Sequence, residues 1–322
     1  MIKKIPFHEI EGFYTGHATD VPNATGVTVI LAPESAVAGV DVRGGGPATR
    51  ETNLLDPTCM VQAIHAVVLS GGSAFGLEAS SGVMEYCRDH GWGFNLKDIT
   101  VPIVVQASLF DLSVGNPKAF PDKQMGFEAC VNAEQNHPQS GNVGAGTGAS
   151  VGKWAGFENA MKTGQGLCAY QAGDLKVGAI VAVNACGDVF EPDSKERLAG
   201  MYDYKTKTPL NSEDALLNGL AQTPGDRQNT TIACIITNAR LNKAEMNKLA
   251  SMAQNALART IRPVHTPSDG DTVFAMTTGK VDADLTAVSV LAVKALSEAI
   301  ADAAKSAEAA YGLASWSSLQ ND

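Results

Sequence analysis

The sequence lacks the cysteine and histidine spacings of disulfide frameworks and metal sites. Its six cysteines include no CxxC pair, and its six histidines show neither HExxH nor HxxxH spacing. Scattered single cysteines are typical of small buried side chains in proteins of a reducing compartment. We therefore expect no disulfide, no metal and no other cofactor, and we expect a cytoplasmic protein.

Membrane and nucleic-acid signals are also missing. No apolar run reaches the roughly 18 residues of a membrane-spanning helix, and the basic segment Met1–Pro6 lacks the apolar core of a signal peptide. Acidic residues outnumber basic ones by 34 to 24, which gives a net charge of −10 without a basic patch. We therefore expect no membrane or nucleic-acid partner, and a small molecule as substrate.

Apolar residues, by contrast, are abundant enough for a large core. They make up 44% of the 322 residues, and neither a repeat nor a low-complexity run interrupts them. The sequence predicts strands packed beneath paired helices at both ends of the chain, which favours a layered α+β architecture. We expect one domain that spans residues 1–322.

The first half of the chain predicts a hairpin followed by two helices. Residues 26–31 and 36–43 are expected to form the two strands of an antiparallel hairpin. Asp56 and Pro57 resemble a helix start, and apolar residues at helical spacing follow up to the break at 71–72. A second helix is expected to begin at Ser73.

The second half alternates strands with longer helices. Residues 176–190 alternate as a strand does, with Asn184 near one end. Residues 191–229 are polar and irregular and predict a surface excursion. A buried strand is expected over 230–237. A helix capped by Asn242, a strand over 272–276 and an Ala-rich helix over about 284–311 follow.

A glycine-rich loop, residues 141–153, ends in Lys153. It does not fit the phosphate-binding pattern GxxxxGK[ST], because Thr147 stands at the first glycine position and Trp154 follows the lysine. Three of its glycines are spaced by two residues, so the dinucleotide pattern GxGxxG fails as well. The loop is therefore either structural or a place where the backbone approaches a substrate closely.

The stretch Asp226–Ile236 changes abruptly from polar to apolar residues. A polar, turn-prone run ends at Asn229, and a β-branched, apolar run begins at Thr230. If the chain is cut between these two residues, the Thr230 hydroxyl becomes a nucleophile with its own α-amine as base. Without a cut, Thr230 is an ordinary strand threonine.

Four polar residues elsewhere have two interpretations each. Lys153 is by default a solvated lysine, but beside the glycine-rich loop it can reach into a cleft. Asn184 lies in an apolar strand, where a buried amide needs partners and can stabilise an oxyanion. Asp269 and Asp271 flank Gly270 in what is by default only a turn.

Taken together, several stretches resemble the L-aminopeptidase/D-esterase family of self-processing hydrolases. The resemblance covers nearly the whole chain, and the Asn-Thr-Thr junction is most similar to the nylon-oligomer hydrolase branch; the β-peptidyl aminopeptidases form another branch. The matching stretches are 23–29, 41–45, 47–51, 69–77, 141–153, 177–184, 229–231 and 262–274.

The resemblance implies an α+β fold, namely a four-layer αββα sandwich similar to that of N-terminal-nucleophile hydrolases. It also implies self-cleavage of the Asn229–Thr230 bond, which would leave an α fragment, 1–229, and a β fragment, 230–322. Thr230 would be the nucleophile, and the family is commonly tetrameric, so a homo-oligomer is expected. The other catalytic residues implied are Lys153, Asn184, Asp269 and Asp271.

Two places depart from the family pattern, namely Phe110 and the stretch 163–167, where relatives tend to have a more glycine-rich run. Relatives often carry a tyrosine where Phe110 stands before Asp111, so a phenol that can hydrogen-bond in the site is missing. We assign Phe110 and Gly146 to substrate binding. The implied activity is hydrolysis of an amide or ester bond in small peptides or amino-acid oligomers. The alternatives are an uncleaved, catalytically silent relative that binds a small molecule in the same cleft, and a structural, shell-forming oligomer.

Overall fold

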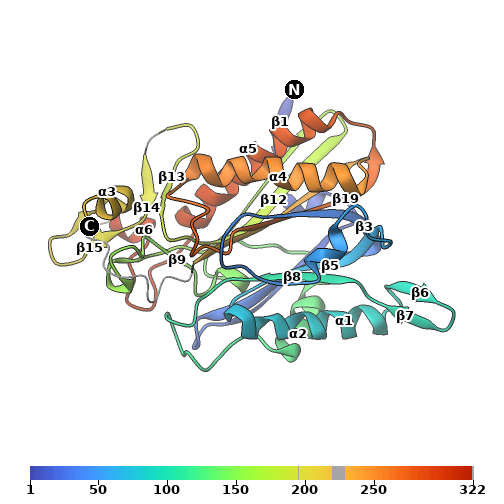
Figure 1. Cartoon of the computed structure of the whole chain (residues 1–322), viewed down its shortest axis with the longest axis horizontal. Helices are drawn as coiled ribbons and strands as arrows, with labels where there is room; N and C mark the ends of the chain where they lie inside the picture. The colour runs from blue at the N-terminus through green and yellow to red at the C-terminus, as the bar shows by residue number, and fades with distance from the viewer. Residues whose placement is uncertain (195, 220–228, 321–322) are drawn as a thin grey trace.

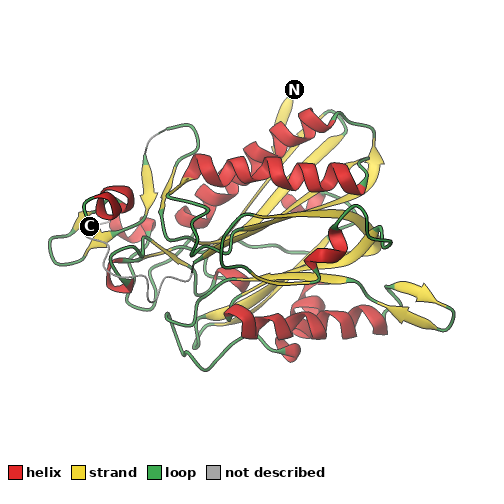
Figure 2. Ribbon diagram, in the orientation of Figure 1, coloured by secondary structure: helices red, strands yellow, loops and turns green. Residues whose placement is uncertain are grey.

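Two layers of strands lie between two layers of helices in the computed structural model of the chain (Figures 1 and 2). The structure describes residues 1–194, 196–219 and 229–320. Helices α4 (Lys243–Thr260) and α5 (Leu285–Lys305) cover one side, and α1 (Ala79–Asp89) and α2 (Lys123–Ala133) cover the other. This arrangement confirms the expected αββα sandwich.

A single bent strand, β3 (Thr25–Val42), joins the two strand layers. Its second half pairs with β19 (Thr272–Val281), and its first half pairs with β2 (Tyr14–Asp20) and β5 (Ala63–Ser70). The register against β5 shifts between Leu31 and Ala36, which is where the strand passes from one layer to the other. From β19 the first layer continues through β17 (Thr230–Ala239), β12 (Leu175–Asn184), β11 (Gln165–Ala172) and β1 (Ile2–Ile5). From β5 the second layer continues through β8 (Val104–Ser108) and β4 (Ala48–Arg50).

Alternating side chains on these strands build three apolar clusters. On β12, Val181 packs on the side of α4 and α5, whereas Ile180 packs between the strand layers. On β3, Ile30 joins the middle cluster and Val29 packs on the side of α1 and α2. All four side chains are fully buried. Each such burial stabilises the fold by about 1.5–3 kcal/mol, so the stacked layers hold β12, β17 and β19 firmly in place.

Several sequence-based predictions are confirmed on these three central strands and their helices. Strand β12 ends at Asn184, and β17 begins at Thr230. Helix α4 follows a capping box in which the Asn242 side chain accepts from the backbone N–H of Glu245, and the Glu245 side chain accepts from the backbone N–H of Asn242.

Two predictions in the first half are wrong. The helix expected to begin at Asp56 and Pro57 is replaced by β5, a strand that is buried throughout most of its length. β5 is parallel to β8 and covered on both faces, so its sequence is mostly apolar and lacks the alternation of a half-buried strand. The hairpin expected for 26–31 and 36–43 is also wrong, because both segments belong to β3 and its hairpin partner is β2.

The predicted surface excursion, together with the strand β13 just before it, forms several small elements at one end of the molecule (Figure 1). The buried carboxylate of Asp188 anchors them, because it accepts from the backbone N–H of Met201 and from the backbone and hydroxyl of Ser212. Residues 220–228, including the polar start of the junction at Asp226, lie outside the described part. The elements are β13 (Asp188–Phe190), β14 (Arg197–Ala199), β15 (Tyr202–Asp203), β16 (Thr208–Pro209) and α3 (Ser212–Leu217).

The described ranges contain further short elements. They are the hairpin strands β6 (Phe94–Leu96) and β7 (Ile99–Val101), the strands β9 (Ser150–Val151), β10 (Met161–Lys162) and β18 (Ile261–Arg262), and helix α6 (Trp316–Leu319). The 3₁₀ helices are η1 (Phe7–Glu9), η2 (Thr52–Leu55), η3 (Ser73–Glu78), η4 (Gly144–Gly146) and η5 (Phe157–Asn159). In the described ranges, no helix has the length and apolar character needed to span a membrane.

Candidate active site

The Asn229–Thr230 junction lies at the point where β17 enters the first strand layer. Thr230 stands directly opposite Asn184 of β12, and Asn229 forms a parallel bridge with Asp269. Residues opposite each other in an antiparallel pair place their side chains on the same face. The junction is buried, with Asn229 only 2% and Thr230 only 4% exposed. The fold therefore brings Thr230, Asn184 and Asp269 into one place.

Two donors converge on the carbonyl group of Asn229. The Thr230 hydroxyl donates to the Asn229 carbonyl oxygen, and the backbone N–H of Gly270 donates to the same oxygen at 2.8 Å. Only glycine permits this approach, because a Cβ at Gly270 would lie 2.7 Å from Thr230 Oγ1. The hydroxyl thus lies against the peptide bond that precedes it, and the oxygen of that bond is held by a fixed backbone donor.

The two aspartates that flank Gly270 have different hydrogen-bonding states. Asp271 is fully engaged, because its Oδ1 accepts from Thr231 N at 2.8 Å and its Oδ2 accepts from His265 N at 3.1 Å and contacts His265 Nδ1 at 2.9 Å. Asp271 thereby links the start of β17 to the turn at His265, which precedes β19.

Asp269, by contrast, keeps one oxygen without a partner. Its Oδ2 accepts from the backbone and hydroxyl of Thr266 at 2.8 and 2.6 Å. Its buried Oδ1 has no hydrogen-bond partner among the residues that the structure describes. Burial, together with the charge of Asp271, raises the pKa of Asp269 to about 6. A carboxylate with a free oxygen and a pKa near neutrality suits a proton acceptor.

Lys153 and Asn184 form a second polar group beside the junction. Lys153 Nζ donates to the backbone oxygen and to Oδ1 of Asn184 at 3.1 and 2.8 Å. The same Oδ1 accepts from Ser150 N at 3.1 Å, and Asn184 Nδ2 donates to the Phe110 carbonyl oxygen at 2.8 Å. These contacts fix the amide, and an amide nitrogen has two N–H groups, so one remains for another acceptor.

Electrostatic coupling links this group to the aspartates. Burial lowers the pKa of Lys153 to about 8, and acidic neighbours that include Asp269 and Asp111 oppose this shift. Asp111, the residue after Phe110, is itself buried, which raises its pKa to about 6. It accepts from Thr25 Oγ1 and Gly72 N, both at 2.8 Å.

The structure thus gathers most, but not all, of the residues singled out in the sequence. Phe110 contacts the group through its carbonyl oxygen, whereas Gly146 packs on the backbone of Gly164 and Gln165. Gly270 and Asp111 are additional participants that sequence reasoning missed. The only signal for Gly270 was its place between two aspartates, and a buried aspartate such as Asp111 carries no distinctive spacing at all.

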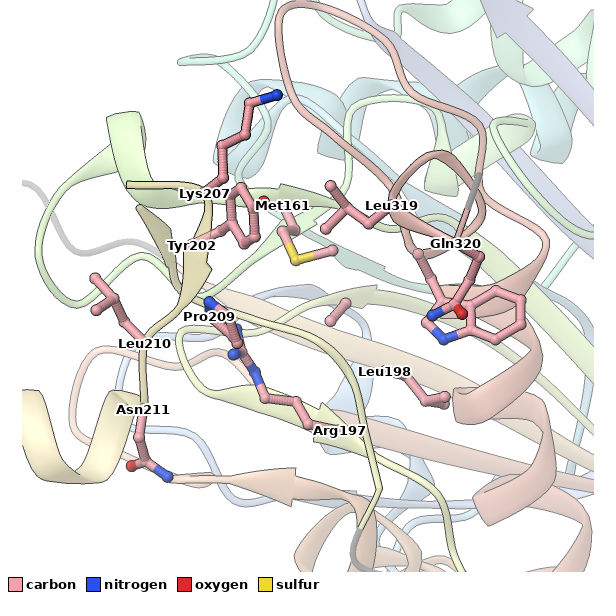
Figure 3. Close-up of a pocket in the computed structure, with 12 residues that line it drawn as sticks. Met161, Arg197, Leu198, Tyr202, Lys207, Pro209, Leu210, Asn211, Leu319 and Gln320 are labelled. Carbon is pink, nitrogen blue, oxygen red and sulfur yellow. The ribbon is translucent and has the colours of Figure 1, made fainter. Parts of the chain in front are cut away.

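A separate cavity of about 700 Å³ lies among the small elements of the excursion (Figure 3). The residue set that lines it contains none of the predicted site residues. Its charged members are Arg197 and Lys207, and Arg197 Nε lies 3.8 Å from Asp188. The other lining residues are Met161, Leu198, Ala199, Tyr202, Pro209, Leu210, Asn211, Trp316, Leu319 and Gln320.

Comparison with protein families gives a match over almost the entire chain. The model of peptidase family S58 matches residues 8–315. The chain is 40% identical over 299 residues to an uncharacterized aminopeptidase of Mycobacterium leprae, covering 87% of this chain and 80% of that protein. It is 31% identical over 280 residues to the 6-aminohexanoate-oligomer endohydrolase of Paenarthrobacter ureafaciens, covering 85% of this chain and 75% of that protein.

Solved structures with lower sequence identity share the fold. A β-aminopeptidase from Burkholderia sp. superposes with a TM-score of 0.71 at 19% identity, covering all of this chain and 94% of that chain. The L-aminopeptidase D-Ala-esterase/amidase of Ochrobactrum anthropi, described as a variant of the Ntn hydrolase fold, gives 0.70 at 18% identity, covering 93% and 85%.

Proposed function

The chain belongs to peptidase family S58, and from this premise we propose that it cuts itself before Thr230 and then uses Thr230 as an N-terminal nucleophile. Membership of the family supports a hydrolase of peptide or amide bonds. The observation that carries the finer proposal is the pair of contacts at the Asn229 carbonyl oxygen, from the Thr230 hydroxyl and from Gly270 N–H.

In the self-cleavage step, Thr230 Oγ1 attacks the carbonyl carbon of Asn229. The oxyanion that forms stays on the oxygen already bound by Gly270 N–H, a fixed backbone donor of the kind that stabilises tetrahedral intermediates. The hydroxyl proton passes to a base and then to the nitrogen of Thr230 as the C–N bond breaks. An ester links Asn229 to Thr230 Oγ1, and water hydrolyses it to a carboxylate on Asn229 and a free Thr230.

Asp269 is the base that the geometry favours for this step. Its neighbour Asp271 has both oxygens engaged by Thr231 and His265, and Lys153 already donates to Asn184. Asp269 Oδ1 is free among the described residues, and its residue is bridged to Asn229. A free carboxylate oxygen next to the reacting peptide can take the proton before any free amine exists.

After the cut, the new α-amine of Thr230 serves as base for substrates. An α-amine has an ordinary pKa of about 7.7–8.0, and the Lys153 cation would lower it and keep the amine neutral. Gly270 N–H and the remaining N–H of Asn184 would hold the substrate oxyanion. Loss of one such donor typically costs about 100- to 1,000-fold in rate.

An uncleaved, catalytically silent relative that binds a small molecule remains the second candidate. It is supported by the burial of Thr230, which is 4% exposed in the intact chain, and by Phe110 in place of a tyrosine. The two candidates differ in one observable, the presence of a cut before Thr230.

Intact-mass measurement and a denaturing gel test the proposal directly. We expect wild-type protein to give fragments 1–229 and 230–322, and we expect Thr230→Ala to remain one chain without hydrolytic activity. Thr231→Ala is the matched control, because Thr231 Oγ1 is buried without a hydrogen-bond partner in the described part, and this variant should still be cut. A wild-type protein that is active yet uncut would rule out the scheme.

The substrate class follows from the same family. We propose small peptides, amides, esters or amino-acid oligomers, with aminoacyl p-nitroanilides and 6-aminohexanoate oligomers as the first compounds to assay, since the relatives are named for aminopeptidase and 6-aminohexanoate-oligomer hydrolase activity. All six cysteines are free thiols and five are buried, which supports the proposed cytoplasmic location.

A further inference from the structure

Lys162 is a buried lysine that the proposed chemistry does not use. It lies on β10, directly opposite Ser150 of β9, and its side chain has no exposed surface. Lysines are almost never buried in this way unless their charge is partnered. The side chain therefore has a specific role in this part of the molecule.

The surroundings of Lys162 Nζ match an ammonium group. Nζ donates to the carbonyl oxygens of Gly146 at 3.2 Å, Ala149 at 3.1 Å and Thr163. An ammonium has three N–H donors, whereas a neutral amine has two, so three acceptors favour the charged form. Burial lowers the pKa of Lys162 to about 7, and the charge of Asp111 opposes this effect.

The three carbonyls belong to the two segments that flank Asn184. Ala149 precedes Ser150, whose N–H donates to Asn184 Oδ1 at 3.1 Å. Thr163 N donates to the Ala149 oxygen at 3.1 Å, and Thr163 Oγ1 donates at 2.6 Å to the oxygen of Val183, the residue before Asn184. One cation thus ties the glycine-rich loop and the strand end together on both sides of the amide.

We propose that Lys162 is a positioning residue for self-cleavage and for hydrolysis, and this inference rests on the proposed function. By clamping the loop, it holds Ser150 N–H and Lys153 against Asn184 Oδ1, so that the free N–H of the Asn184 amide faces the reacting carbonyl. Lys162 touches no reacting atom, and it acts through the loop.

Removal of the ammonium would leave three carbonyl oxygens without their donor and release the loop. The Asn184 amide would then lose its fixed orientation, and a small misplacement of a group that acts in the transition state can cost about 100-fold in rate. The Asn184 amide is proposed to hold the oxyanion, which forms only during the reaction, so binding of the substrate before reaction should depend on this amide much less. The expected signature is a fall in kcat with little change in KM.

A second lysine in the chain provides a matched control. Lys243, the first residue of α4, is 4% exposed, and its Nζ also donates to three backbone oxygens, those of Leu54, Cys59 and Val61, at 2.8, 3.2 and 2.9 Å. These carbonyls lie in η2 and in the segment between η2 and β5. None of the site residues named above hydrogen-bonds to them in the described part of the chain. Lys243→Met likewise removes a buried ammonium group that donates to three carbonyl oxygens, at a position outside the proposed site.

The experiment compares Lys162→Met with Lys243→Met. Precursor is made by cell-free translation, its cleavage is followed by gel and mass, and kcat and KM are measured on an aminoacyl p-nitroanilide that the wild-type protein hydrolyses. We expect Lys162→Met to slow cleavage and lower kcat by about 10- to 100-fold, with KM within about threefold, at a melting temperature no lower than that of Lys243→Met. Equal cleavage rates in the two variants would overturn the positioning role.

A further pair of variants covers the case in which Lys162→Met does not fold because the buried Asp111 loses one of its two neighbouring cations, Lys162 and Lys153. Asp111→Asn/Lys162→Met is then compared with Asp111→Asn alone, and the same fall in cleavage rate is expected. An unchanged rate in the double variant would again overturn the role. If the wild-type chain itself is not cut, the proposed function fails first, whatever the lysine variants do.

Discussion

At the scale of single residues, Gly270 leaves room for the Thr230 hydroxyl because it has no side chain. Gly270→Ala places a methyl group where 2.7 Å separates the Cβ position from Thr230 Oγ1. Because the methyl group and the hydroxyl cannot share this space, the hydroxyl must leave the Asn229 carbonyl or the Gly270 N–H must shift. We expect self-cleavage to slow by about 100-fold or more, measured as the half-life of the precursor on a denaturing gel.

Gly46 supplies the control for this substitution. It lies in the neighbouring turn, where its N–H donates to the Asp269 carbonyl oxygen at 2.8 Å. A Cβ at Gly46 would meet no atom closer than 3.8 Å, so Gly46→Ala should be cut at close to the wild-type rate. Rapid cleavage of Gly270→Ala would show that the close approach of Gly270 is irrelevant to the reaction.

Asp269 predicts the pH dependence of self-cleavage. Its pKa is raised to about 6, first by burial and then by Asp271, and only the deprotonated carboxylate can accept the Thr230 proton. The rate should therefore be low below pH 5, rise through about pH 6 and level off above it. The measurement is precursor decay after dilution of freshly translated protein into buffers of different pH.

Asp269→Asn tests the assignment of that titration. An amide cannot take the proton, so we expect slower cleavage, by about 100- to 10,000-fold, and no rise near pH 6. Asp271→Asn disturbs the contacts to Thr231 and His265 but should keep a rise with pH. Its midpoint should move below pH 6, because the Asp271 charge that helps raise the pKa of Asp269 is gone. A pH profile that persists unchanged in Asp269→Asn would assign the base to another group.

Single residues also show what sequence alone could and could not predict about the site. Thr230 stands at a visible change from polar turn to apolar strand, and Lys153 and Asn184 entered through family resemblance. The donor at Gly270 is a backbone N–H, which every non-proline residue has, so no residue type signals it. Lys162 was missed because an isolated lysine in a sequence is expected at the surface, and its three acceptors are backbone atoms.

At the scale of elements, the strand β5 explains the main error in the predicted fold. Its sequence, Ala63–Ser70, is a short, mostly apolar run that only His65 interrupts before Ser70, and such a run fits a helix or a doubly covered strand equally by periodicity. The length of eight residues and the adjacent valines were the better guides. By contrast, α4 was predictable because an Asn242 cap and an apolar stripe agree on the same boundary.

Helix α5 predicts a stability effect that is independent of catalysis. It crosses β11 at Gly166, where a Cβ would lie 2.0 Å from the Ala299 carbonyl oxygen and 2.4 Å from Ala303 N. Gly166→Ala must push the helix away from the strand, and overpacking of this kind costs about 1–3 kcal/mol. The free energy of unfolding should fall by that amount in urea titrations made in the Thr230→Ala background, where the chain stays in one piece.

A matched substitution in the same background checks that the effect is local to this crossing. Gly46→Ala adds the same methyl group without a clash and should change the free energy of unfolding by less than about 0.5 kcal/mol. If Gly166→Ala lowers the free energy of unfolding by no more than Gly46→Ala does, α5 is free to move relative to β11.

At the scale of the whole molecule, the two proposed fragments interlock. β17 and β19 belong to the later fragment, yet β17 pairs with β12 and β19 pairs with β3 of the earlier one. A cut at Asn229–Thr230 breaks one covalent bond and leaves both ladders intact. We expect native mass spectrometry to show the fragments together in equal numbers, and the same spectrum reports whether this unit forms the expected homo-oligomer. Separate fragments under native conditions would contradict the interlocked arrangement.

The β17–β19 pair lies between β12 and β3 of the other fragment, so the mature protein cannot refold in the way its precursor folds. An uncut chain folds as one molecule, because a single backbone connects the strands that must pair. Once cut, the same sheet can re-form only if two separate molecules meet, each of which exposes the apolar strand edges that the other should cover. Thermal unfolding should therefore be reversible for Thr230→Ala and irreversible for the cut protein. The working lifetime of the cut protein is then set by the rate at which its fragments unfold and separate, and not by an equilibrium.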